Sequence, residues 1–201
     1  AISGGAFNAE GSTGIFNASG GMKTILTGGA SFTPIVLSTQ GGAASYAFMD
    51  ETRALGDFTV TEGVTLDNNA FSPSFNIGGN LLVDESRGAV SWVKGTGTIT
   101  FSSTSAQTAD FKGKSVEKIV SANTAAGGLT FAGDVQTVEF AVTTSQLASA
   151  ATVYFQDNST FTVGAFKVDG TPDYPVVLKP AQGGVWHLNV TGTEVVSDVQ
   201  V

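Results

Sequence analysis

The chain has 201 residues, of which 41% are hydrophobic and 13% are charged, and its formal net charge is −8. That hydrophobic content argues against disorder, and the acidic balance argues against nucleic acid as a partner, because phosphate binding needs clustered Lys and Arg. The absence of cysteine excludes disulfides, thiolate metal sites and a Cys nucleophile, and no apolar run approaches the roughly 20 residues of a membrane span.

Glycine is abundant, with 26 residues scattered singly and in pairs among Thr, Val, Phe and Ser. This composition is typical of many short strands joined by tight turns. The chain begins at Ala1 rather than Met, so we expect a secreted protein with its leader removed, or a fragment.

The first 40 residues contain strand-like pieces separated by glycine pairs, at 5–8, 13–17, 23–27 and 32–38. Pro34 lies inside the last of these, which places that piece at a sheet edge or a bend.

Residues 43–56 differ from their surroundings, because they are more charged and poorer in glycine. We predict a short helix or an excursion here, ending at Gly56 as a natural residue after a helix.

Alternation of apolar and polar residues then resumes. It predicts strands over 57–66, a strand pair around Gly78-Gly79 over 75–83, and a strand, glycine turn and strand over 92–103.

An internal repetition links the two halves. Phe7 and Phe16 are nine residues apart, as are Trp92 and Phe101, at an offset of 85. Phe75 and Phe161 agree at an offset of 86. We therefore predict a duplication, with repeat one at 1–87, repeat two at 88–201, and residues 43–56 as an insertion in repeat one.

Each repeat divides into pieces of roughly 20 residues, a length that suits the coils of a parallel β-helix. We predict an all-β, single-domain parallel β-solenoid over 1–201. The alternative is a tandem antiparallel β-sandwich, since regular turns suit that fold too.

Three phrases, at 97–108, 157–164 and 186–193, look like the β-helical repeats of large bacterial surface and secreted proteins. The resemblance implies an extracellular right-handed β-helix of the adhesin or surface-fibre type. It carries over no catalytic residue, because packing defines these repeats.

Candidates for chemistry are few. His187 is the only histidine, and we expect it to be a surface or packing residue. The acidic candidates are Asp50-Glu51, Asp84-Glu85 and Asp169 with Asp173, all in expected turns. Asp67-Asn68-Asn69 and Asp157-Asn158 could offer oxygen ligands to calcium but lack a calcium-loop spacing. We predict no catalytic residue, cofactor or metal, and keep a polysaccharide-degrading β-helix enzyme as the least favoured function.

The ends of the solenoid carry the main functional prediction. Uncapped coils expose unpaired backbone groups and an apolar cross-section, which recruit another chain. We predict a subunit that assembles head-to-tail with copies of itself into an extracellular filament, through Ile2, Phe7, Phe16, Val195, Val196, Val199 and Val201. The alternative is a carbohydrate-binding or adhesive module that presents Tyr46, Trp92, Tyr154, Tyr174 and Trp186 to glycans.

Overall fold

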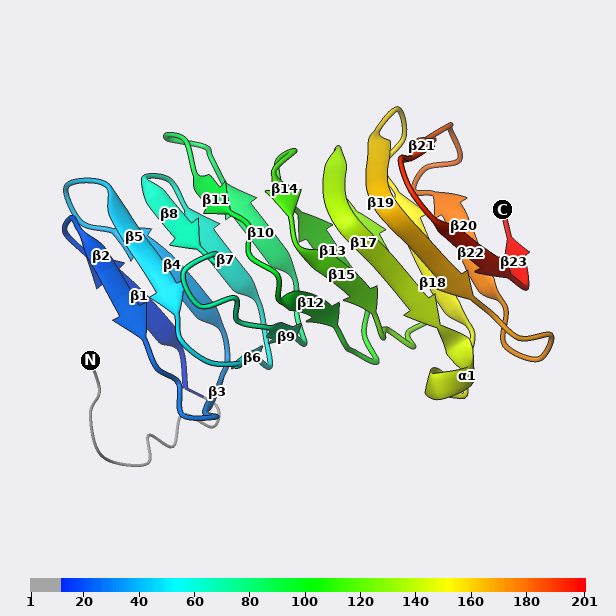
Figure 1. Ribbon diagram of the computed structural model, residues 1–201, viewed down its shortest axis with the longest axis horizontal. Helices are drawn as coiled ribbons and strands as arrows, with labels where there is room; N and C mark the ends of the chain where they lie inside the picture. Colours follow the sequence, from blue (N-terminus) through cyan, green and yellow to red (C-terminus); the bar gives the residue numbers. More distant parts are fainter. Residues whose placement is uncertain (1–11) are drawn as a thin grey trace. The chain divides into compact units, whose positions relative to one another are not determined.

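The computed structural model describes residues 12–201 as an all-β parallel β-solenoid (Figure 1). The ladders that join strands of successive coils are parallel, which confirms the predicted fold class over the antiparallel sandwich. Among these residues the helical content is α1 (Thr144–Leu147). The fold comprises two compact units, residues 1–99 and 100–201, and each is described by itself.

In the first unit each coil adds one strand to each of three sheets. The first sheet contains β1 (Gly14–Ala18), β4 (Ile35–Thr39), β7 (Phe58–Thr61) and β10 (Leu81–Asp84). The second contains β2 (Met22–Ile25), β5 (Ala44–Phe48), β8 (Val64–Asp67) and β11 (Ser91–Val93). The third contains β3 (Ser31–Phe32), β6 (Thr52–Ala54) and β9 (Phe75–Ile77).

The alternating pattern produces the core of this unit. Phe16, Leu37, Val60 and Val83 occupy one ladder position in successive coils, and all but Phe16 are fully buried. Side chains two residues apart in a strand share a face, and in-register parallel strands stack such faces into columns. Phe48 joins the columns of different sheets, with ring centroids 5.6 Å from Phe75 and 6.1 Å from Phe16.

The expectation of a helix or excursion at 43–56 is wrong. These residues form β5 and β6, which pair in register with their neighbours in the coils before and after. The charged run marks a corner between two strands. The Asp50 carboxylate accepts hydrogen bonds from the backbone N–H groups of Thr27 and Gly28 in the previous coil, at 2.9 and 2.7 Å.

Other local predictions are confirmed. Pro34 lies at the bend between β3 and β4, and Gly78-Gly79 separates β9 from β10. The stretch over 92–103 contains β11 and β12 (Thr98–Phe101), and the boundary between the two units falls within β12. The strand expected over 5–8 lies outside the described residues.

The coil is the unit of structure that repeats. Ile35, Phe58 and Leu81 are successive ladder partners, each 23 residues from the next (58 − 35 and 81 − 58). Phe16 lies on the first strand of its coil, whereas Phe101 lies on β12, which follows β10 and β11. The 85-residue offset therefore does not join equivalent coil positions at these two residues.

In the second unit the chain alternates between two principal sheets. One contains β13 (Gln107–Asp110), β16 (Leu129–Phe131), β18 (Ala151–Phe155), β20 (Val176–Pro180) and β23 (Val199–Gln200). The other contains β14 (Ser115–Val116), β15 (Lys118–Ser121), β17 (Val135–Thr143), β19 (Thr160–Asp169), β21 (His187–Val190) and β22 (Glu194–Ser197).

A bend runs through the second of these sheets. It interrupts the pairing of β17 with β19 between Thr137 and Glu139. In the coils on either side, the same bend divides the chain into two strands, β14 and β15 before it and β21 and β22 after it. At the bend a Cβ on Gly164 would lie 2.6 Å from the carbonyl oxygen of Val138, so glycine is required by close backbone approach.

The core of the second unit is aromatic. The Phe161 ring centroid lies 5.0 Å from Phe131, 5.3 Å from Phe140 and 5.1 Å from Phe155. All four side chains are at most 2% exposed. Offset and edge-to-face packing of this kind adds to the stabilisation from burial alone.

Candidate assembly surfaces

The first described coil borders a hollow of about 400 Å³. Its lining includes Phe16, Lys23, Ile25, Leu26 and Tyr46, all on β1, β2 and β5 or next to them. The Tyr46 hydroxyl lies 2.7 Å from the carbonyl oxygen of Ser38 and 3.0 Å from that of Phe16, and burial raises its pKa. The lining of the hollow thus combines apolar side chains with Lys23 and with Tyr46, whose hydroxyl is hydrogen-bonded to the backbone.

Apolar side chains around this hollow reach solvent. Ile15 is 65% exposed, Met22 54% and Leu26 51%. Within the described residues, β1 pairs with β4 and β2 pairs with β5, so each presents one hydrogen-bonding edge without a strand beside it. An edge of this kind can accept a further strand.

The last coil exposes apolar side chains at positions that face inward in the solenoid. Leu188 and Val190 on β21 are the ladder partners of the buried residues Phe161 and Val163. Val196 on β22 stacks in the same way on Val168. These side chains continue the inward columns, yet Leu188 is 41% exposed and Val196 53% exposed.

The predicted interface residues are distributed unevenly. Ile2 and Phe7 lie outside the described residues. Phe16 is half-buried, with its ring 5.9 Å from that of Phe32. At the other end, Val196 and Val199 continue inward columns, whereas Val195 pairs with the exposed Lys167 and faces outward. Val201 is 92% exposed.

Sequence reasoning missed Leu188 and Val190 as members of this surface. The alternation over 187–190 was a signal for them, because it predicts a strand whose Leu and Val share one face. It also missed Lys23 and Glu194, since no local pattern places a lone charge on the inward face of a strand.

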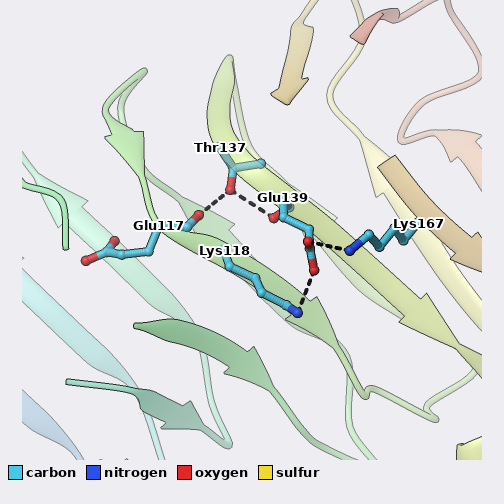
Figure 2. Close-up of polar contacts among 5 residues, drawn as sticks. All are labelled: Glu117, Lys118, Thr137, Glu139 and Lys167. Atoms are coloured by element: carbon cyan, nitrogen blue, oxygen red, sulfur yellow. Dashed lines mark hydrogen bonds and ion pairs between the residues drawn. The ribbon is translucent and has the colours of Figure 1, made fainter. Parts of the chain in front are cut away.

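A cluster of charges lies on β15, β17 and β19 of the second unit (Figure 2). Glu139 Oε2 lies 2.7 Å from Lys167 Nζ, and Oε1 forms an ion pair with Lys118 at 2.5 Å. Burial would raise the pKa of Glu139, but hydrogen bonds and charge from Lys118 and Lys167 outweigh it and hold the pKa below its ordinary value. Thr137 donates to the Glu117 carbonyl oxygen beside them. This cluster ties three successive coils together.

Three of the acidic candidates for catalysis accept hydrogen bonds from nearby groups of the chain. Asp84 accepts a hydrogen bond from the N–H of Ser86 at 3.0 Å, Glu85 accepts from that of Val90 at 2.8 Å, and Asp169 accepts from the Ser197 hydroxyl. His187 is exposed on β21, in line with the expectation of a surface residue.

The calcium candidates are hydrogen-bond acceptors too. Asp67 accepts from the N–H groups of Asn69 and Ala70, and Asp157 accepts from those of Gln182 and Gly184. Residues 12–201 contain no group of three or more His, Cys, Asp or Glu placed to hold a metal ion. No helix in this part of the chain is long and apolar enough to cross a membrane.

The aromatic candidates for glycan binding differ in exposure. Tyr46 is 2% exposed, which removes it from any surface platform, while Tyr174 is 39% exposed. Trp186 is half-buried and stacks on Phe155, with centroids 3.9 Å apart and rings 11° from parallel. Trp92 and Tyr154 are half-buried.

Comparison of the chain with protein-family models, curated proteins and solved structures gave no match.

Proposed function

We propose that this chain is a structural subunit of an extracellular filament or surface fibre, of the β-helical adhesin type. Its subunits assemble head-to-tail by stacking the last coil of one copy on the first coil of the next. The observation that carries the proposal is the exposure of Leu188 and Val196 at positions that are buried in the coil beneath.

Stacking another coil on this surface is favourable for two reasons. It removes apolar side chains from water, at about 25 cal/mol per Å² of apolar area buried. It also completes the backbone hydrogen bonds of edge strands, which natural proteins otherwise protect.

The two end coils contain three strands each, in three sheets in the first described coil and in two sheets in the last complete one. The first described coil contains β1, β2 and β3, and the last complete coil contains β20, β21 and β22. A contact between unlike ends is heterologous, and a heterologous contact that does not close into a ring extends into a filament.

The test is concentration-dependent assembly of the purified protein. We expect sedimentation velocity to resolve species larger than the monomer as concentration rises, and negative-stain electron microscopy to reveal linear assemblies. Dispersed monomers at millimolar concentration would contradict the proposal. So would assembly that is unchanged when Leu188 and Val196 are both replaced by Asp, with circular dichroism confirming that the solenoid persists.

A further inference from the structure

The sheet that contains β2 ends within the first unit. Its order is β11, β8, β5 and β2, and no strand of the second unit belongs to it. The other two sheets continue into the second unit. One begins with β1 and ends with β23, and the other begins with β3 and ends where β21 and β22 pair with β19. A last coil that extends those two sheets therefore brings no strand to the free edge of β2.

The free edge of β2 presents backbone groups next to an apolar hollow. The carbonyl oxygens of Gly21 and Ile25 accept hydrogen bonds from N–H groups on or directly after β5, at 3.0 and 2.8 Å. Since successive residues of a strand direct their backbone groups to opposite sides, those of Met22 and Thr24 point to the free edge. Beside this edge lies the hollow of about 400 Å³, which β2 helps to line.

Lys23 decides which strand this edge can accept. It is the ladder partner of Tyr46 and shares a strand face with the buried Ile25, so its side chain faces the hollow. Within residues 12–201 its ammonium has no ion-pair partner, whereas Glu139 in the second unit is held by two lysines. A strand laid on β2 would remove the ammonium from water, and burying an unpaired charge is strongly unfavourable. A strand that brings a carboxylate to Lys23 avoids this cost.

We propose that the free edge of β2 binds an extended segment of a partner protein, which adds to the sheet as a strand and places a carboxylate against Lys23. The next inward side chain of that segment, two residues from the carboxylate, is apolar and packs beside Ile25 and Leu26 in the hollow. Backbone hydrogen bonds to Met22 and Thr24 supply affinity, and the carboxylate supplies specificity. The site exists in the single chain, and stacking a second copy through the two continuous sheets leaves it open.

The test uses the synthetic peptide Thr-Val-Thr-Glu-Thr-Val-Thr with blocked ends. Its symmetrical pattern presents a carboxylate and a neighbouring valine in either strand direction. NMR titration is carried out at a protein concentration where the wild type is monomeric. We expect the amide signals of Met22 and Thr24 to shift, and their hydrogen exchange to slow, as the peptide saturates the site.

Changes to the peptide test the role of the carboxylate. Replacing its Glu with Gln should weaken binding at least about tenfold, because the Lys23 charge is then buried without a partner. Replacing the same Glu with Lys should abolish binding, because two ammonium groups would face each other in the hollow.

Charge reversal in the protein separates pairing from general disruption. Lys23→Glu should lose the peptide that contains Glu and bind the one that contains Lys. The charge-matched control is Lys179→Glu, whose side chain is exposed on β20 in the second unit, and it should bind like the wild type. Circular dichroism confirms that the solenoid persists in both variants.

Several outcomes would overturn this site. They are equal binding of the three peptides, binding that Lys23→Glu leaves unchanged, and shifts confined to amides away from β2. No binding at all would overturn it too, and binding that appears only in Phe7→Asp would identify residues 1–11 as the occupant in place of a partner.

Assembly is measured separately from peptide binding. A wild type that never assembles overturns the proposed function and leaves the peptide result standing by itself. An assembled wild type that no longer binds the peptide would show that the joint covers β2, which overturns the claim that the site stays open.

Discussion

The charge of Glu139 is held in place by two lysines. Its two carboxylate oxygens interact with lysines from the coils on either side, Lys118 on β15 and Lys167 on β19 (Figure 2). The lysine side chains are 38% and 46% exposed, so solvent screening limits the energy of each contact.

Replacing Glu139 with Gln should lower the free energy of unfolding at pH 7 by up to about 1 kcal/mol. Because folding lowers the pKa of Glu139, its contribution is present above the ordinary pKa of 4.5 and is lost as the pH falls through the folded-state value. The difference between variant and wild type should therefore shrink in acid, as measured by urea denaturation at pH 7 and pH 3.

The control for this prediction is Glu51→Gln, which removes an exposed carboxylate that forms no ion pair in the described part of the chain. It should leave stability nearly unchanged at both pH values. A loss for Glu139→Gln that is equally large at both would show that the variant acts through packing instead of charge.

At the scale of elements, the bend across β17 and β19 lets two long strands of the second unit turn a corner without ending. Gly164 lies where the backbone of β17 comes closest, and the backbone of Gly164 in turn approaches Gly192 in the next coil. The glycines therefore stack along the bend, each giving room to the chain beside it.

Gly164→Ala should lower the free energy of unfolding by roughly 1–3 kcal/mol, because the added Cβ would overlap the Val138 carbonyl oxygen and force the strands apart. Thermal denaturation followed by circular dichroism measures this. The matched control is Gly42→Ala, where a Cβ would meet no atom within 4 Å and the backbone angle is ordinary for any residue. Equal effects of the two substitutions would contradict the account of the bend.

At the scale of the whole molecule, each coil is stabilised mainly by the coils directly beside it, as in repeat proteins generally. In the second unit, β17 and β19 have strands on both sides, whereas β21, β22 and β23 have a strand on one side only within the described residues. Local opening should therefore be easiest in the last coil.

Hydrogen exchange measured by mass spectrometry should find slow amides over β16 to β19 and fast amides over β21 to β23 in dilute solution. If subunits stack end to end, protection over β21 to β23 should rise with protein concentration while that over β16 to β19 stays constant. Uniform protection across the second unit in dilute solution would contradict the nearest-neighbour account.

Local pattern was sufficient to locate most strands. Phe58, Val60, Val64 and Leu66 alternate with polar residues and are all buried, because a strand covered on one face imposes that period on its sequence. The same reasoning failed at 43–56, where it predicted a short helix or an excursion instead of the strands β5 and β6. The role of Asp50 depends on Thr27 and Gly28, more than 20 residues earlier, and no local pattern contains that contact.

The sequence alone therefore determined the class of this protein: short strands, tight turns and coils of roughly 20 residues stacked in parallel. Tertiary structure decided which residues stack on which, and hence that Lys23 and Glu194 face inward at the ends while Val195 faces outward. The physical reason is that side-chain direction in a strand reverses with every residue, so a shift of one residue between coils exchanges core and surface. Only the ladder between residues of neighbouring coils settles that register, and with it the candidate assembly surface.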